Sequence, residues 1–297
     1  MPSFSASVKD ELCRAEVKSG CCARAECYGA LLLGNTFCAR GLKILTSHAA
    51  FAERLSPLFE AAFSFAPDPA RRPERGGKWL FSLTRPERAR AVRAAYGYGE
   101  GDDTVLHLNN AVLEEDCCLK AFWRGAFFSG GTAADPLKKY LLELVTPHRV
   151  LARELSALLR ESGLEASLSE RAGVQVLALK TSEAIEDFLA LTGAPVAAMA
   201  VMEAKLEKEI RNSVNRRVNC DTANVDKTLA AVSRLRDAIG RLERSGRLDG
   251  LPETLQETAR ARVGCPEDSL AQLAARLGIS KSCLNHRLRK LAELGAR

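Results

Sequence analysis

An internal duplication constrains the fold of this chain more than any other feature of its sequence. Residues 52–59, AERLSPLF, match residues 152–159, ARELSALL, at an offset of 100. Upstream, CYGALLLGN at 27–35 corresponds to WRGAFFSGG at 123–131 at an offset of 96, so the loops between the matches differ by about four residues. The first two thirds of the chain are therefore predicted to be one domain built from two repeats, about 21–96 and 117–193.

Each repeat carries a Gly-Ala pair inside an apolar helix, Gly29-Ala30 and Gly125-Ala126. Glycine destabilises a helix interior by roughly 1 kcal/mol relative to alanine. Close approach of two helices is a physical reason to keep it, because a missing side chain lets their backbones come together. We expect the two glycine-containing helices to pack against each other.

Hydrophobic periodicity predicts alternating helices and strands in this domain. The predicted helices are residues 22–34, 49–64, 118–129, 148–161 and 182–191. The predicted strands are residues 41–47, 78–83, 139–145 and 174–179, with loops at 66–77 and 96–103.

A duplicated αββαββα-like unit with paired glycine-containing helices resembles the LAGLIDADG homing endonucleases. That resemblance implies mixed helices and antiparallel sheets about a pseudo-twofold axis. It also implies one acidic residue just before the final glycine of each motif helix, and these two acids together bind the metal ions. Here those positions are Gly34 and Gly130, so the acids are missing and no nuclease activity is expected. Asp135 is the nearest alternative ligand, although Asp before Pro is more typical of a turn.

The sheet surface of homing endonucleases binds DNA, which makes the basic residues near the second motif candidates for that role: Arg124, Lys138 and Lys139. A solvated surface is the alternative. Residues 1–193 hold 24 Lys and Arg against 24 Asp and Glu, whereas residues 194–297 hold 19 against 13. The whole net charge of +6 therefore lies in the last third, as expected of a segment that meets a polyanion.

Residues 194–250 are predicted to form a helical connector between the two domains. Met199, Met202, Leu206 and Ile210 form an apolar stripe expected to pack, and Asp221-Thr222 are expected to cap a second helix that begins near Ala223.

Residues 251–297 divide into three short helices. The first opens at Pro252, the second runs from Leu270 to Leu277, and the third begins after Ser280. Gly278 makes the turn, and the small Ala274 with the apolar Leu284 fits a helix-turn-helix. An all-α DNA-binding domain is predicted here, with a helical hairpin of an enzyme as the alternative.

The third helix places its leucines inward and its polar residues outward. Asn reads adenine, Arg reads guanine, and flanking basic residues neutralise phosphates. His286 has no partner His or Cys at ligand spacing and is expected to act as a hydrogen-bonding group. The candidate DNA-binding residues are Ser280, Lys281, Ser282, Asn285, His286, Arg287, Arg289 and Lys290.

Taken in order, four segments are similar to the WhiA family of transcription regulators: SFSASVKDEL, RGAFFSGGTAADPLKKYLLEL, NRRVNCDTANVDKT and SLAQLAARLGISKSCLNHRLRKL. The resemblance implies an α+β fold in which an inactivated LAGLIDADG-like domain precedes a helix-turn-helix. It also implies regulation of genes for sporulation, division or chromosome segregation, with double-stranded DNA as a partner. RNA polymerase or another regulator is a further candidate partner, and a monomer is compatible with the internal pseudo-symmetry.

The ten cysteines show no paired CxxC spacing, so reduced and mostly buried thiols are expected, with no metal and no cofactor. The motifs HExxH, GxSxG and a phosphate-binding Gly loop are absent from the sequence. The N-terminus has no basic region followed by an apolar stretch, which predicts a cytoplasmic protein. The predicted DNA binding implies that this protein is associated with the nucleoid.

Overall fold

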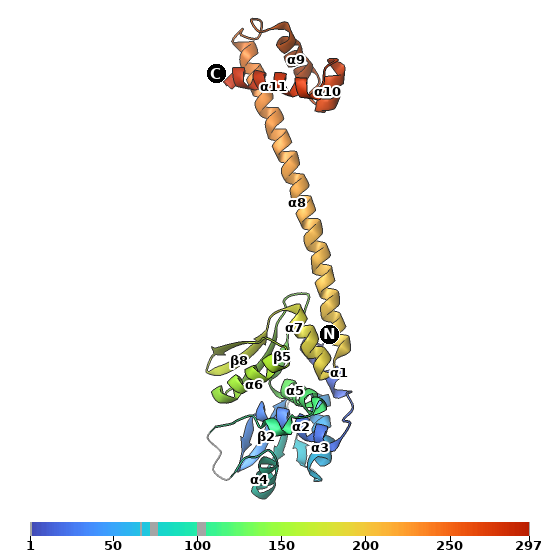
Figure 1. Cartoon of the computed structure of the whole chain (residues 1–297), viewed down its shortest axis with the longest axis vertical. Coiled ribbons are helices and arrows are strands. Elements are labelled where there is room, and N and C mark those ends of the chain that lie inside the picture. Colours follow the sequence, from blue (N-terminus) through green and yellow to red (C-terminus); the bar gives the residue numbers. More distant parts are fainter. Residues whose placement is uncertain (1, 66, 72–76, 100–104, 297) are drawn as a thin grey trace. The chain divides into compact units, whose positions relative to one another are not determined.

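The computed structural model of the protein describes residues 2–65, 67–71, 77–99 and 105–296. These form two compact units, Met1–Glu209 and Ile210–Arg297 (Figure 1). The division falls later than the boundary predicted after residue 193, because the start of α8 (Pro195–Arg244) packs on the first unit. The Glu11 carboxylate accepts hydrogen bonds from the backbone N–H groups of Val196 and Ala197 at 2.7 and 2.9 Å, and Lys208 Nζ donates to the Pro136 carbonyl at 2.7 Å.

The first unit contains the predicted duplication, preceded by α1 (Phe4–Cys13). The first repeat runs α2 (Gly20–Leu32), β1 (Thr36–Cys38), β2 (Gly41–Thr46), α3 (Ala49–Phe63), β3 (Asp68–Arg71), β4 (Trp79–Leu83) and α4 (Pro86–Ala95). After a 3-10 turn at Asn110–Val112, the second runs α5 (Asp116–Gly130), β5 (Gly131–Ala133), β6 (Leu142–Thr146), α6 (Arg149–Glu161), β7 (Ser167–Arg171), β8 (Val174–Leu179) and α7 (Ser182–Thr192).

Both repeats share one sheet topology, which confirms the duplication. Each sheet has four antiparallel strands, in the orders β1-β2-β4-β3 and β5-β6-β8-β7. The registers correspond as well, since Leu42 faces Leu83 in the first sheet and Leu142 faces Leu179 in the second. Helices α2 and α5 lie side by side between the two sheets (Figure 1).

The glycines of the motif helices allow that contact. A Cβ at Gly29 would lie 2.1 Å from the carbonyl oxygen of Phe122, and one at Gly125 would lie 1.9 Å from that of Glu26. No side chain fits at these distances, so the prediction of close helix packing is confirmed.

Several short elements differ from the predicted ones. The strand predicted at 139–145 begins only at Leu142, because Asp135 starts a turn in which its carbonyl accepts hydrogen bonds from the Lys138 and Lys139 N–H groups. The loop predicted at 66–77 contains β3, and its residues 66 and 72–76 lie outside the described part of the chain. Strand β7 was not predicted because all five of its residues are exposed, so it lacks an apolar alternation.

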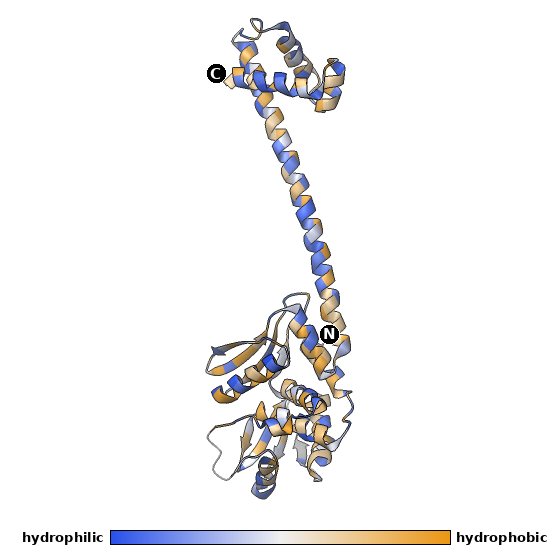
Figure 2. Ribbon diagram, viewed as in Figure 1, coloured by the Kyte–Doolittle hydropathy of each residue, from blue (hydrophilic) through white to orange (hydrophobic). Residues whose placement is uncertain are grey.

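Helix α8 is continuous, so the predicted helix start near Ala223 is wrong. Asp and Thr are favoured caps, but neither residue breaks a helix as Gly or Pro does, and the helical backbone continues through them. The predicted packing of the Met pair is also wrong within the described residues, since Met199 and Met202 are 59% and 47% exposed. In Figure 2, hydrophobic and hydrophilic residues alternate along this helix.

None of the helices in the described part of the chain has the length and apolar character needed to cross a membrane.

Candidate functional site

The C-terminal unit is built on a small leucine-rich core. Helices α9 (Glu253–Gly264), α10 (Leu270–Arg276) and α11 (Lys281–Ala296) enclose it together with the end of α8. Leu273, Leu284 and Leu291 are fully buried within it. Gly295 of α11 packs on α8, where a Cβ would lie 2.4 Å from the Ala238 carbonyl oxygen. The predicted three-helix division is confirmed.

Local hydrogen bonds start both α10 and α11, and a glycine makes the turn between them. Ser269 and Gln272 form a reciprocal capping box at the start of α10. Gly278 has a φ of 65°, a left-handed conformation that glycine adopts without a steric penalty. The Ser280 hydroxyl then accepts from the Cys283 N–H at 3.1 Å, which starts α11. The turn therefore follows from the residues that identified it in the sequence.

The outer face of α11 is the candidate site. On the inner face, Leu284, Leu288 and Leu291 are buried as predicted. Arg289 shows how open the opposite face is: its side chain is 83% exposed, and its Nε lies 4.0 Å from the Glu293 carboxylate. The predicted residues that are exposed, here called the outer α11 face, are Ser280, Lys281, Ser282, Asn285, His286, Arg289 and Lys290.

Arg287 differs from the other predicted residues. It is half-buried, and its Nη1 donates to the Thr254 carbonyl at 3.3 Å and to the Thr258 hydroxyl at 3.4 Å. Both partners lie on α9. Arg287 therefore holds α11 against α9, and its guanidinium is already engaged within the unit.

The first unit has glycine at the two positions where the endonuclease acids are expected. Gly34 follows α2, and a Cβ there would lie 3.0 Å from the Ala30 carbonyl oxygen. Gly130 ends α5, and a Cβ there would lie 2.7 Å from Leu33 Cδ2 and 2.8 Å from the Val145 carbonyl oxygen. A carboxylate at Gly130 would displace its neighbours, so the surrounding packing has adapted to glycine.

Two of the other candidate residues in this unit have structural partners. Asp135 Oδ1 accepts from the Leu137 N–H at 3.0 Å, which is the turn geometry favoured for it. Arg124 was a candidate DNA contact, but it is mostly buried and donates to the Thr192 carbonyl at 2.9 Å and to Glu26 Oε2 at 3.1 Å. Both of its partners lie within the N-terminal unit, so the candidate role of Arg124 as a DNA contact is not supported. Lys138 and Lys139 are exposed.

Sequence reasoning missed one constellation, the four sulfurs of Cys21, Cys22, Cys117 and Cys118. They lie within 4.8 Å of one another at the starts of α2 and α5. The expectation of mostly buried thiols is wrong for the described residues, of which only Cys22, Cys27 and Cys118 are buried. The offset of 96 that relates Gly29 to Gly125 also relates these cysteine pairs and could have revealed them.

Comparison with known families matches both parts of the chain. The WhiA LAGLIDADG-like domain matches residues 119–211, and the WhiA C-terminal HTH domain matches residues 214–295. A probable cell division protein WhiA from Ruminiclostridium cellulolyticum is 38% identical over 305 residues, covering 99% of this chain and 97% of that protein. One of the same name from Desulforudis audaxviator is 35% identical, covering 98% and 96%.

Solved structures show the same fold. Full-length DUF199/WhiA from Thermotoga maritima aligns with a TM-score of 0.61 and 21% identity, covering 100% of this chain and 99% of that one. The N-terminal LAGLIDADG domain of DUF199/WhiA aligns with a TM-score of 0.51 and 18% identity, covering 65% of this chain and 91% of that one. The predicted α+β architecture, a duplicated LAGLIDADG-like domain followed by a helix-turn-helix, is confirmed.

Proposed function

This chain belongs to the WhiA family, and we propose that it is a sequence-specific regulator of transcription that binds double-stranded DNA through α11. Its targets are proposed to be genes of sporulation, cell division or chromosome segregation, and the cell-division name of its relatives supports such a role. RNA polymerase or another regulator is the proposed protein partner. The observation that carries the proposal is the outer α11 face, which is polar, basic and exposed.

The chemistry of this face suits the major groove. Asn285 lies one turn after Lys281 and one turn before Arg289, so the three side chains share a side of the helix. Asn pairs with both edges of adenine, and Arg pairs with guanine O6 and N7. Lys281 at the start of the helix, and Lys290 beside Arg289, are placed to neutralise phosphates. The net positive charge of the C-terminal unit attracts the DNA phosphates as well, since residues 210–297 hold 17 Lys and Arg against 10 Asp and Glu.

Exchanging Asn285 or Arg289 for Ala is expected to weaken binding to the preferred duplex and to relax the preference for it. Each lost base contact costs about 1–3 kcal/mol, or roughly 5- to 150-fold in affinity. Preferred duplexes are obtained by selection from a random pool, and affinities are then measured by fluorescence anisotropy at fixed salt.

Two variants control for charge and folding. Lys281→Ala should weaken all duplexes alike and reduce the salt slope of log K by about 1. Arg171→Ala, which removes an exposed Arg from the N-terminal unit, should leave affinity unchanged. A chain ending at residue 250 that retained full affinity would contradict the assignment to α11.

The protein is proposed to bind DNA without cutting it, because Gly34 and Gly130 supply no carboxylate. Supercoiled plasmid incubated with the full chain and Mg²⁺ or Mn²⁺ should be retarded in a gel yet remain supercoiled. The competing proposal is a LAGLIDADG-type endonuclease. Nicking that is lost on Asp135→Asn would support that enzyme with a displaced ligand.

The N-terminal unit has two candidate roles. It contacts DNA together with α11, or it is a scaffold that binds other proteins while α11 alone contacts DNA. The charge balance of residues 1–193 favours the scaffold, as does the engagement of Arg124 inside the unit. The length of the DNA protected from nuclease digestion by the full chain separates the two roles, because a second contact surface would extend the footprint.

A further inference from the structure

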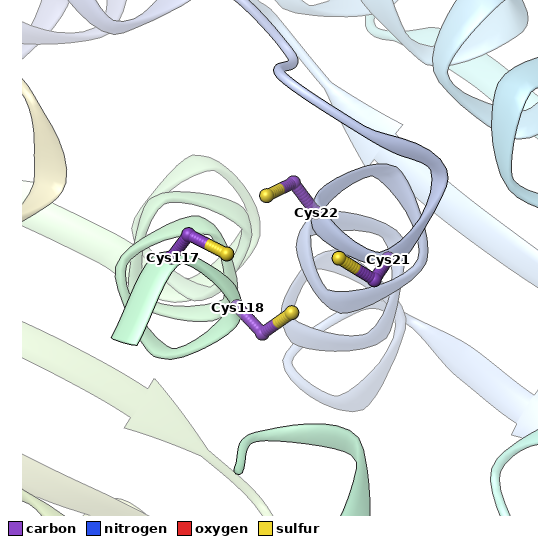
Figure 3. Close-up of side chains that lie close together, drawn as sticks. All are labelled: Cys21, Cys22, Cys117 and Cys118. Carbon is purple, nitrogen blue, oxygen red and sulfur yellow. The ribbon is translucent and has the colours of Figure 1, made fainter. Parts of the chain in front are cut away.

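Four thiols from two distant segments converge at the starts of α2 and α5. Cys21 and Cys22 lie in the first turn of α2, and Cys117 and Cys118 lie in the first turn of α5. All four sulfur atoms lie within 4.8 Å of one another. Figure 3 shows the side chains of both helices turned toward the space between them. We refer to these residues as the four-cysteine cluster.

The cluster follows the internal symmetry of the domain. Cys21 corresponds to Cys117 and Cys22 to Cys118 at the offset of 96 that also relates Gly29 to Gly125. In each helix the cysteine pair precedes the glycine by about two turns. The close approach at the glycines therefore brings the two first turns together, and each repeat contributes half of the cluster.

We propose that the four-cysteine cluster binds one zinc ion as a tetrahedral tetrathiolate that joins the two repeats. Zn–S bonds of about 2.3 Å place tetrahedral sulfurs about 3.8 Å apart, so the sulfurs need to move by only about 1 Å. Binding displaces the four thiol protons, which pass to solvent, and no oxidant or reductant is needed.

Burial raises the thiol pKa values of Cys22 and Cys118, so a bound cation has to displace their protons. Two features beside the cluster offset part of that cost. Each pair sits at a helix N-terminus, where unsatisfied N–H groups and the helix dipole stabilise negative charge. The Ser19 hydroxyl lies 3.0 Å from Cys21 Sγ and 3.2 Å from Cys22 Sγ, which places a hydrogen-bond donor next to two of the ligands. Partners of this kind orient metal ligands and tune their basicity.

The geometry limits two other uses of these cysteines. Neighbouring cysteines in a helix are poor disulfide partners, because a disulfide requires sulfurs about 2.05 Å apart with a specific dihedral angle. A disulfide between the two helices is the remaining alternative, and the mass of the chain before reduction decides between it and the metal site. A [4Fe–4S] cluster binds each thiolate at a different iron and would hold the sulfurs further apart than a single ion does. The arrangement of four sulfurs around one point fits a single soft or borderline cation.

Cobalt(II) provides the test, because its tetrahedral tetrathiolate complexes absorb strongly in the visible. The full chain, reduced and freed of metal, is titrated with Co²⁺ and then with Zn²⁺. We expect a tetrahedral thiolate spectrum that saturates at one equivalent and is abolished by Zn²⁺. The absence of this spectrum or saturation at another ratio would overturn the proposal. So would a mass of the purified chain, measured before reduction, that is lower by the hydrogens lost in a disulfide.

The variant Cys21→Ser/Cys117→Ser removes the two exposed ligands, and it should weaken Co²⁺ binding by more than about tenfold. Cys220→Ser is the matched control, since Cys220 is exposed but lies outside the cluster, and it should leave the titration unchanged. If the double variant fails to fold, alkylation of the native chain decides the question. Zn²⁺ should protect Cys21 and Cys117 from alkylation but leave Cys220 reactive, and equal labelling of all three would contradict the site.

Discussion

Glu26→Ala is expected to lower the free energy of unfolding of the N-terminal unit by about 3–5 kcal/mol. Glu26 is fully buried in α2 between two arginines. Its Oε1 lies 2.6 Å from Arg54 Nε, and its Oε2 accepts from Arg54 Nη2 at 3.0 Å and from Arg124 Nη1 at 3.1 Å. Removing the carboxylate leaves two guanidinium groups in the interior without their counter-charge, which is the most costly way to break an ion pair. Urea unfolding followed by far-UV circular dichroism measures the loss.

Glu143→Ala is the matched control, because it removes the same group from an ion pair with Arg171 on the sheet surface. The Arg171 side chain is 65% exposed, so water screens the pair, and the expected change is within about 1 kcal/mol. Glu26→Gln keeps the hydrogen-bond acceptor and should fall between the two. A Glu26→Ala protein as stable as the Glu143→Ala protein would show that water reaches the arginines.

The ion pairs of Glu26 join parts of the fold that the sequence keeps far apart. Arg54 comes from α3 of the first repeat and Arg124 from α5 of the second, so Glu26 connects the two halves of the domain. Periodicity assigned Glu26 to an apolar helix but could not indicate a buried charge, because its partners lie 28 and 98 residues away. The same distance in sequence made Arg124 look like a free basic residue.

Long elements with a strong apolar period were predictable from local sequence. The helix predicted at 49–64 is α3, and the strand predicted at 174–179 is β8. The short strands β1, β5 and β7 were missed because tertiary pairing rather than propensity fixes them. Helix α4 was missed because its many charged residues hide the apolar spacing of Ala89 and Val92, which are buried.

The candidate DNA site was predictable for a similar reason. A helix-turn-helix is a local motif, and Ala274, Gly278 and Leu284 fix its geometry within a few residues. What the sequence could not separate was Arg287 from Arg289. Both are arginines of one helix, but Arg287 faces α9 and donates to Thr254 and Thr258, whereas Arg289 remains exposed.

Gly125→Ala is expected to destabilise the N-terminal unit by about 3 kcal/mol or more, although Ala is the better helix former by roughly 1 kcal/mol. The added Cβ would lie 1.9 Å from the Glu26 carbonyl oxygen and 2.9 Å from the Ala30 nitrogen. These are backbone atoms of α2, so the clash is relieved only if the two helices separate. Gly29→Ala should destabilise the unit by a similar amount, since its Cβ would lie 2.1 Å from the Phe122 carbonyl oxygen. Chemical unfolding gives the free energy for each variant.

Gly20→Ala is the control within the same helix pair, because its Cβ would meet only the Ala61 carbonyl oxygen, at 3.8 Å. That is an ordinary van der Waals distance, so the Gly20→Ala protein should be as stable as the native protein or slightly more stable. A rise in stability for Gly125→Ala would mean that α2 and α5 do not touch at the glycines. If the helices separate as expected, the two halves of the four-cysteine cluster move apart with them. A folded Gly125→Ala protein carries all four thiols and should therefore bind Co²⁺ more weakly than the native chain.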